Sequence, residues 1–217
     1  TVSGNTITRY GSSMYYNTAN YKTLDPVICA VSPTKAIVVY GDNQNTAIGT
    51  AVGITITETL DEYGTNIWVG SPVVYEPADS LKKSIIKLSE NKAIVVYYDS
   101  ANSSRGTACV LNLSGTGSGT TITAGTPFVY DSNNCSPSSH SAVLMDTDKV
   151  LVVYTRQNVG YFCVLSISGT TITGATPVQF AALSNYQHVA MTGTDAIITY
   201  KNGSNTYGTT LVVSFPL

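Results

Sequence analysis

Charged residues are scarce in this sequence. Lysine, arginine, aspartate and glutamate make up 11% of the 217 residues, and the formal net charge is -2. A nucleic-acid-binding chain is expected to carry a basic patch that neutralises phosphates, so we expect no nucleic-acid partner. No apolar run reaches the roughly 18 residues that a transmembrane helix needs, so we expect no membrane insertion. No signal-peptide pattern is recognisable.

Residues that commonly hold cofactors are also few. The four cysteines show neither C-x-x-C nor Cys/His spacing, which argues against zinc. Cys109 and Cys163 occupy the same place in two successive repeats, and such positions are usually too far apart for a disulfide. We therefore expect free thiols. No phosphate-binding loop and no Asp-rich calcium loop is present, so the sequence predicts no cofactor and no metal.

Catalytic patterns are likewise missing. His140 and His188 are the only two histidines, and no nucleophile-elbow motif accompanies either. A glycosidase needs two facing carboxylates, whereas Asp146 and Asp148 fit turn positions and Asp25 stands just before a strand. We predict that the protein is not an enzyme. A glycan-active hydrolase is the less favoured alternative.

An apolar hexapeptide that occurs four times dominates the sequence. It reads KAIVVY, KAIVVY, KVLVVY and DAIITY, and the copies span Lys35–Tyr40, Lys92–Tyr97, Lys149–Tyr154 and Asp195–Tyr200. Successive copies start 57, 57 and 46 residues apart, and the 22 residues after Asp195 plus the 35 up to Lys35 make 57 again. Repeats of this length are typical of solenoids and propellers. A spacing that closes through the chain ends favours a ring.

Each repeat resolves into four predicted strands, A to D. In the second repeat these are Ser84–Leu88, Lys92–Tyr98, Gly106–Leu113 and Thr121–Tyr130. Their β-branched and aromatic residues favour strands, and continuous apolar runs in strand B indicate burial on both faces. Strand D carries a proline, which a sheet tolerates at its edge, so D is predicted to be outermost.

The fourth repeat lacks strand D, and the N-terminus supplies a match for it. Residues 2–8 resemble residues 167–173, and Tyr15 or Tyr16 then takes the place of Phe180. The predicted fold is all-β: a four-bladed β-propeller with four-stranded antiparallel blades, closed when the N-terminal strand joins the C-terminal blade. A single domain spans residues 1–217, with blades at about 26–75, 84–130, 141–180, and 187–217 plus 1–16.

A candidate binding face follows from this topology. The D-to-A loops (17–25, 76–83, 131–140 and 181–187) and the B-to-C loops emerge together, and both sets are polar and variable, as binding loops usually are. Residues that differ between repeats while the scaffold stays alike form the candidate site: Tyr21, Asp42, Lys83, Asp99, Arg105, His140, Arg156, Tyr186, Asn202 and Tyr207. The alternative is that these are solvated loop tips.

The segments GTACVLNLSG and TITAGTPFVY, preceded by KAIVVYYD, resemble a repeat of phage tail-fibre and bacterial surface proteins. The likeness covers nearly the whole chain except the fourth repeat and residues 58–64. It implies an appendage or adhesion context and no catalytic residues. We therefore predict a recognition module that binds a host cell-surface receptor or glycan, located on a virion appendage or a cell surface. The alternative is a structural or oligomerisation domain, and a homo-oligomer is possible.

Overall fold

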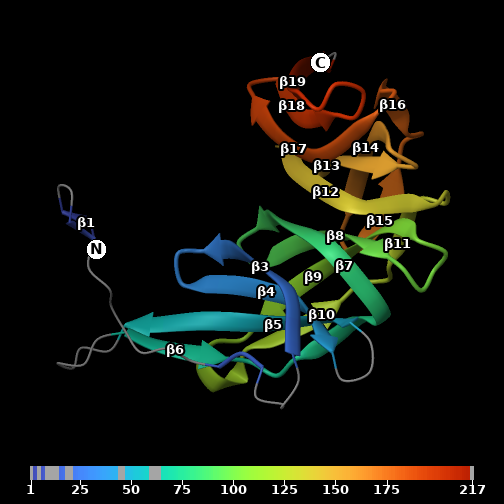
Figure 1. Cartoon of the computed structure of the whole chain (residues 1–217). Coiled ribbons are helices and arrows are strands. Elements are labelled where there is room, and N and C mark those ends of the chain that lie inside the picture. Colours follow the sequence, from blue (N-terminus) through green and yellow to red (C-terminus); the bar gives the residue numbers. More distant parts are fainter. Residues whose placement is uncertain are drawn as a thin grey trace.

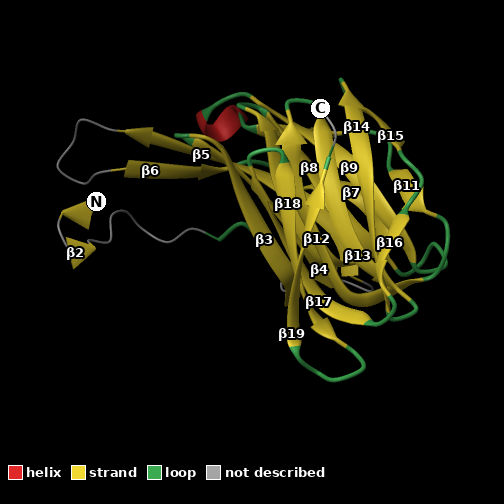
Figure 2. Ribbon diagram, turned by 90° about the horizontal axis from the view of Figure 1, so that it is seen from above, coloured by secondary structure: helices red, strands yellow, loops and turns green. Residues whose placement is uncertain are grey.

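The computed structural model describes residues 2–3, 6–7, 15–17, 22–43, 47–58 and 65–215. These residues form an all-β structure, as the sequence predicts, with one short 3-10 turn, η1 (Gly117–Gly119). Figure 2 shows long strands running alongside one another through the body of the molecule. Within the described part, no helix is long and apolar enough to cross a membrane.

The first two repeats share one nine-stranded antiparallel sheet. The order along it is β10-β9-β8-β7-β5-β4-β3, with β6 on β5 and β11 on β9. Its strands are β3 (Lys22–Ser32), β4 (Lys35–Asn43), β5 (Ala47–Glu58), β6 (Thr65–Val69), β7 (Val73–Ser89), β8 (Lys92–Asp99), β9 (Arg105–Ser114), β10 (Thr121–Ala124) and β11 (Phe128–Asp131).

The third and fourth repeats form separate antiparallel sheets. The third comprises β12 (Cys135–Asp146), β13 (Lys149–Arg156), β14 (Val159–Ser168), β15 (Thr171–Gly174) and β16 (Val178–Ala181). The fourth comprises β17 (Ser184–Thr192), β18 (Asp195–Asn202) and β19 (Gly208–Ser214). We call each repeat with its strands a unit. The A strands are in contact in the order β3, β7, β12 and β17, so the units follow one another in space as in the sequence (Figure 1).

The predicted D strands lie at the sheet edges and are interrupted. In the second unit β10 and β11 both pair with β9, and residues 125–127 between them are not in a strand. The third unit repeats this pattern with β15 and β16 on β14. The interruption contains Pro127 or Pro177, which cannot donate to the ladder. Strand D therefore lies at the edge in the second and third units, but it is not continuous. In the first unit its second half is the start of β7, which lies inside the nine-stranded sheet.

The D-to-A connections are much shorter than predicted. Residues 76–83 are part of the 17-residue strand β7, whose first half pairs with β5 and whose second half pairs with β8. Likewise β11 and β12 are separated only by residues 132–134, and β16 and β17 only by residues 182–183. The prediction of long D-to-A loops was wrong because polar residues in these segments were taken as loop signals. They are strand residues with one face in solvent.

The predicted ring closure is not found among the described residues. β1 (Val2–Ser3) and β2 (Thr6–Ile7) pair with each other, and no described strand completes β19. Figure 1 shows the first unit and the fourth unit at opposite ends of the series. Spacing in a sequence shows which positions are equivalent. Whether four sheets close into a ring depends on the rotation from one sheet to the next, and packing between the sheets sets that rotation.

The core lies between consecutive units and explains the apolar hexapeptides. Alternate residues of strand B face opposite neighbours: Val95 and Tyr97 pack toward the first unit, whereas Ile94 and Val96 pack toward the third. All four side chains are fully buried. Burying one such aliphatic side chain contributes about 1.5–3 kcal/mol. The hexapeptides therefore hold the units together rather than forming a site.

One aromatic contact recurs at every junction, as we call the interface between two consecutive units. The aromatic at the end of strand D lies edge-on to the strand-B tyrosine of the next unit, with centroids 5.3–5.5 Å apart and interplanar angles of 62–68°. The pairs at the three junctions are Tyr75–Tyr97, Tyr130–Tyr154 and Phe180–Tyr200, and Tyr16–Tyr40 has the same geometry on the outer side of the first unit. Tyr16 therefore occupies, against the first unit, the place that a preceding unit's strand D would fill.

The glycine that opens strand C makes room for this aromatic. A Cβ atom on Gly106 would lie 2.4 Å from Tyr130 Cε2, and one on Gly160 would lie 2.5 Å from Phe180 Cζ. Gly49 meets Tyr75 in the same way, at 2.9 Å. Real Cβ atoms essentially never approach other atoms this closely, so the glycine and the aromatic form one packing unit within each repeat.

Candidate functional site

A β-bulge in each A strand places polar residues opposite the buried strand-B tyrosine. The register of β7 against β8 shifts between Leu81 and Ser84, so Lys82 and Lys83 together face Tyr97. The same shift occurs in β3 and β17, whereas in β12 the shift lies between Cys135 and His140, and His140 itself faces Tyr154. Lys82 adopts a positive φ of 48°, and Asp25 and Tyr186 adopt 44° and 56° in their strands. Bulges of this kind re-aim side chains and are frequent near functional sites.

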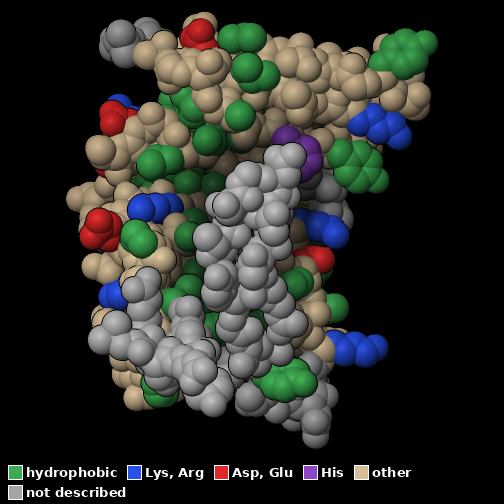
Figure 3. Space-filling model, turned by 90° about the vertical axis from the view of Figure 1, so that its left-hand side faces the viewer, with side chains coloured by type: hydrophobic (Ala, Val, Ile, Leu, Met, Phe, Trp, Pro, Cys, Tyr) green, Lys and Arg blue, Asp and Glu red, His purple; other side chains and the backbone are tan. Residues whose placement is uncertain are grey.

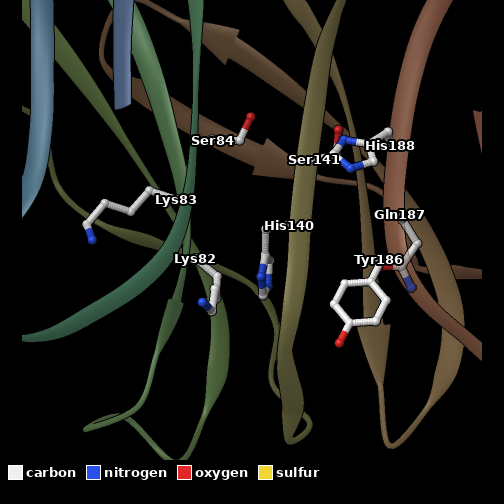
Figure 4. A pocket seen from close by; sticks show the side chains of 8 residues that line it. All are labelled: Lys82, Lys83, Ser84, His140, Ser141, Tyr186, Gln187 and His188. Atoms are coloured by element: carbon white, nitrogen blue, oxygen red, sulfur yellow. The ribbon is translucent and has the colours of Figure 1, made fainter. Parts of the chain in front are cut away.

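These bulges open a cavity of about 340 Å³ between the A strands of the second, third and fourth units. Its lining residues come from β7, β12 and β17 and are Lys82, Lys83, Ser84, His140, Ser141, Tyr186, Gln187 and His188. In Figure 4 Lys82, the His140 ring and Tyr186 lie at one level across three neighbouring strands, while the side chain of Lys83 extends away from His140. Both histidines of the chain therefore line one cavity.

Lys83 and His140 are buried there without polar partners. Their side-chain nitrogens have no hydrogen-bond partner among the described residues. Burial lowers the pKa of Lys83 to about 8, opposed by the charge of Asp25. Burial alone lowers the pKa of His140 to about 4, so this ring is neutral at pH 7. Buried polar groups are normally satisfied, and these nitrogens are therefore candidates for contact with a ligand.

His140 is held by tyrosines on several sides. Its ring stacks on Tyr154 with a centroid distance of 6.0 Å and an interplanar angle of 6°. Tyr130 and Tyr98 lie 6.3 and 6.4 Å away. The imidazole therefore has a fixed orientation, since its ring cannot turn without displacing core aromatics.

The repeat alignment placed Tyr186 at the position of Lys83 and His140, and the structure corrects it by one residue. His188 faces Thr199 as Ser84 faces Val96 and Ser141 faces Val153, so Gln187 is the true counterpart. Gln187 is fully buried and donates hydrogen bonds to Thr155 Oγ1 and Ser184 Oγ. Tyr186 is the extra bulge residue, 63% exposed at the cavity mouth.

Asp42, Asp99 and Arg105 lie at strand ends outside this cavity. Asp99 Oδ1 accepts a hydrogen bond from the Asn102 backbone N–H at 3.0 Å, and Arg105 Nη1 donates to Asn102 Oδ1 at 3.2 Å. Asp42 is the second-last residue of β4 and is half-buried. Asp99 and Arg105 thus fix the turn between β8 and β9, which is a structural role that sequence equivalence does not reveal.

Arg156, Asn202 and Tyr207 also lie apart from the cavity. Arg156 Nη1 lies 3.4 Å from Asp131 Oδ2, and its guanidinium stacks 3.8 Å above the ring of Tyr161. Asn202 Oδ1 accepts a hydrogen bond from the Ser204 N–H, and Tyr207 is 69% exposed in the same loop. Tyr21 lies outside the described residues. Of the predicted site, the structure brings together Lys83, His140 and Tyr186.

The cavity residues that the sequence reasoning missed are Lys82, Ser84, Ser141, Gln187 and His188. Lys82, Ser84, Ser141 and Gln187 are adjacent in sequence to a predicted residue, and His188 is two residues from Tyr186. A bulge adds one residue to one strand only, so a repeat alignment without gaps cannot show which of two neighbours points inward. The signal that was available is a pair of adjacent polar residues opposite an invariably buried tyrosine.

The arrangement suits binding of an anionic or hydroxyl-rich group. Two lysines, two histidines, two serines, a tyrosine and a glutamine line the cavity, and none of its described lining residues is acidic. Asp25 reaches the cavity edge, where its Oδ2 lies 3.8 Å from Lys82 Nζ in a half-exposed ion pair. A lysine ammonium can donate hydrogen bonds to such a group, and a neutral histidine can both donate and accept. Hydrolysis of a glycoside would instead need two carboxylates across the cavity.

Two buried carboxylates belong to the junctions instead. Tyr97 Oη donates to Glu76 Oε2 at 2.9 Å, and Tyr154 Oη donates to Asp131 Oδ2 at 2.7 Å. Each acid directly follows the aromatic that ends strand D.

All four cysteines are free, as predicted, and burial raises the pKa of the Cys109 and Cys135 thiols to about 12. Thiols of this kind are inert.

On one face of the molecule the charges of the described residues form no further patch. Figure 3 shows the face that lies on the left in Figure 1, where the described Lys, Arg, Asp and Glu side chains are scattered. Within the described part, no cluster of three or more potential metal ligands occurs. The cavity between β7, β12 and β17 is therefore the candidate site.

No protein-family model matches this sequence, and no curated protein matches it. Among solved structures, the chain is similar to the sialidase of Trypanosoma rangeli in complex with the inhibitor DANA, with a TM-score of 0.50. The alignment covers 88% of this chain and 36% of the sialidase chain, at 12% sequence identity. At this identity the likeness concerns the fold alone, and it supports a propeller-like arrangement of the sheets.

Proposed function

We propose that the protein is a non-enzymatic recognition module that binds an anionic group, such as a carboxylate of a cell-surface glycan or receptor, in the cavity between β7, β12 and β17. The observation that supports this most is the lining of the cavity, which holds two lysines and two histidines and, among its described members, no acid. The Lys83 ammonium at its edge has no hydrogen-bond partner among the described residues. A carboxylate would provide a charge-assisted hydrogen bond, worth about 1.5–3 kcal/mol. Tyr186 at the mouth offers a stacking face for a sugar ring.

The proposed setting is a phage or bacterial surface appendage, which rests on the resemblance of the repeats. We further propose that the four units are blades of a propeller and that the N-terminal segment supplies the strand D that β19 lacks. The Tyr16–Tyr40 pair supports this, because it has the geometry of the three internal D-to-B pairs. In this arrangement the A strands line an axis and present their bulges to a ligand.

Titration calorimetry with a uronic-acid oligosaccharide tests the proposed function. The Lys83→Met variant keeps the aliphatic stem and loses the charge, so we expect at least a 10-fold loss of affinity, from the energy of a charge-assisted bond. Lys149→Met is the matched control: Lys149 is exposed at the opposite end of β12 and β13, and this change should leave affinity unaltered. A neutral malto-oligosaccharide of equal length should bind more weakly.

Equal binding of the acidic and neutral oligosaccharides, or unaltered affinity in Lys83→Met, would contradict the proposal. A purely structural role is then the better account. Release of reducing ends from the acidic oligosaccharide would instead favour hydrolysis, and it is measured in the same samples.

A further inference from the structure

We propose that a second cavity, lined by residues of β7, β8, β9 and β11, binds an alkylguanidinium group, the side-chain chemistry of arginine, from a partner protein. The cavity has a volume of about 340 Å³, which lies at the small end of the range for ligand pockets. The polar part of its lining consists of Glu76, Asp99, Asn102 and Thr107. It shares no described lining residue with the cavity between β7, β12 and β17, so this inference goes beyond the proposed function.

Two buried carboxylates line this second cavity. Glu76 Oε2 accepts a hydrogen bond from Tyr97 Oη at 2.9 Å, and Asp99 Oδ1 accepts one from the Asn102 N–H at 3.0 Å. Burial raises the pKa of Glu76, and the charge of Asp99 raises it further, so the two acids act on each other. Neither acid forms an ion pair with a described residue. The cavity therefore attracts a cation that the described chain does not supply.

Thr107 gives an independent indication of a ligand. Its side chain lines the cavity and is only 1% exposed, and its Oγ1 has no hydrogen-bond partner among the described residues. Buried polar atoms normally have a partner, because leaving one unsatisfied costs free energy. A hydroxyl oxygen accepts hydrogen bonds, so an N–H group of a ligand in the cavity would satisfy Thr107.

The third unit shows which group fits beside such an acid. Arg156 stands two residues after its strand-B tyrosine, as Asp99 does in the second unit. Tyr161 faces that tyrosine from strand C, as Thr107 does in the second unit. The Arg156 guanidinium lies 3.4 Å from Asp131 Oδ2 and 3.8 Å from the centre of the Tyr161 ring. The junction between the second and third units thus contains a guanidinium of its own.

At the junction between the first and second units, the equivalent place is a cavity. Asp99 and Thr107 have shorter side chains than Arg156 and Tyr161, and both line the open space. Glu76 still accepts the hydrogen bond from the strand-B tyrosine, but no described guanidinium lies beside it. A guanidinium from a ligand would take the place that Arg156 fills at the next junction.

The lining favours an organic cation over a metal ion. Ca²⁺ takes roughly 6–8 oxygen ligands, and the described residues contain no group of three or more potential metal-ligating side chains. Ala78, Pro127 and Val129 form an apolar part of the wall, which suits the carbon stem of a long basic side chain. The planar guanidinium carries several N–H donors that match carboxylate geometry, so one group can contact both acids.

NMR titration of the whole chain with N-acetyl-arginine methylamide tests the proposal. The matched probe is N-acetyl-citrulline methylamide, whose side chain has a similar shape and no charge. We expect saturable shifts of the amide signals of Ala78 and Asn102, whose N–H groups donate to Glu76 and Asp99. The citrulline compound should bind at least about 10-fold more weakly, because it lacks the charge-assisted hydrogen bonds. Equal binding of the two compounds, or no shift with the arginine compound, would overturn the proposal.

Asp99→Asn tests the role of the second acid. The amide keeps an acceptor for the Asn102 N–H and removes the charge, so affinity for the arginine compound should fall about 10-fold. Asp148→Asn is the matched control, since Asp148 is exposed in the turn between β12 and β13, and its affinity should equal that of wild type. Unaltered affinity in Asp99→Asn would contradict the proposed site.

The double variant Asp99→Arg/Thr107→Tyr reproduces the residues of the next junction. Its own guanidinium should fill the cavity, so the arginine compound should no longer bind, and retained binding would contradict the proposed equivalence. If this variant does not fold, Asp99→Asn still decides. Calcium chloride should cause no saturable shift at Ala78 or Asn102, and saturation by Ca²⁺ would overturn the choice of an organic cation. None of these measurements involves an acidic sugar, so they are independent of the proposed function.

Discussion

The junction between the first and second units and the junction between the second and third have the same apolar packing but different charges. In both, a strand-D tyrosine meets a strand-B tyrosine, whose hydroxyl donates to the acid that follows strand D. Two residues beyond the strand-B tyrosine, however, stands Asp99 at the first of these junctions and Arg156 at the second. Asp99 adds a second negative charge near Glu76, whereas Arg156 pairs with Asp131.

The last residue of the strand-A bulge also differs between these two junctions. Lys83 occupies this position at the first of the two junctions and neutral His140 at the second. This position thus holds a lysine whose charged neighbours are Asp25 and Lys82 at the first junction, and an uncharged ring at the second. The comparison teaches that repeated aromatics fix the packing while the neighbouring positions are free to vary, and that these positions set the charge of the cavity and its surroundings.

The largest expected effect concerns acid and His140. Because its folded-state pKa is about 4 and the ordinary value is 6.5, the unfolded state takes up the proton first as pH falls. Stability is lost from about pH 6.5 down to about pH 4, by roughly 1.4 kcal/mol per pH unit and on the order of 3 kcal/mol in all. Chemical denaturation at pH 7 and pH 4.5 should show a smaller pH-dependent loss in His140→Phe than in wild type.

His188→Phe is the control for that measurement, because His188 is exposed at the same cavity. Its pH dependence should follow wild type. If His140→Phe lost as much stability on acidification as wild type, protonation of His140 would not cause the loss. The difference in charge between His140 and Lys83 would then not explain a difference between the two junctions.

A smaller effect is expected when the ion pair of the second junction is broken. Arg156→Gln removes the cation beside Asp131, whose side chain is only 1% exposed. Tyr154 still donates to this acid, so we expect a loss of about 2 kcal/mol in the free energy of unfolding, the scale of one hydrogen bond to a charged group. Arg105→Gln removes a charge that has no ion pair among the described residues, so it should change stability much less. Equal losses of stability in the two variants would show that the charge of Arg156 does not stabilise the second junction.

The smallest effect, of opposite sign, is expected at the first junction. Burial, with the nearby Asp99 charge, raises the pKa of Glu76, so the native state binds its proton more tightly than the unfolded state and ionisation at pH 7 costs stability. Glu76→Gln keeps an acceptor for Tyr97 and should leave stability at pH 7 unchanged or modestly raised. The advantage should shrink as the pH falls and Glu76 becomes protonated in wild type.

Glu90→Gln controls for the loss of one negative charge, because Glu90 is exposed in a turn. Thermal melts of both variants from pH 7 to pH 4 make the comparison. A marked destabilisation by Glu76→Gln at pH 7 would contradict this expectation. It would show that ionised Glu76 stabilises the first junction, as we expect of Asp131 at the second.

The sequence predicted the features that repeat and missed those that break the repeat. The four hexapeptides located the buried strands because a strand buried on both faces must be apolar throughout. The sequence comparison put Tyr15 or Tyr16 in the place of Phe180, and the ring of Tyr16 lies against Tyr40 with the same geometry as Phe180 against Tyr200. Local pattern and packing agree at these positions.

The bulges and the curvature could not be predicted in the same way. A bulge changes which of two neighbours faces the cavity, so Tyr186 was chosen where Gln187 is the counterpart. The strand β7 crosses from one unit to the next without a loop because its polar residues have a solvent-facing side, which composition alone does not distinguish from a loop. Whether four units meet depends on the angle between packed sheets, which no spacing in the sequence encodes.

The central claim is that an anionic ligand binds between β7, β12 and β17, and the two histidines allow a direct measurement. Both line the cavity, so imidazole NMR signals of the whole chain report on this site alone. On titration with a uronic-acid oligosaccharide, the signals of His140 and His188 should both shift and saturate together, and Lys83→Met should weaken the response. Saturable binding of the oligosaccharide that leaves both imidazole signals unchanged would contradict the claim.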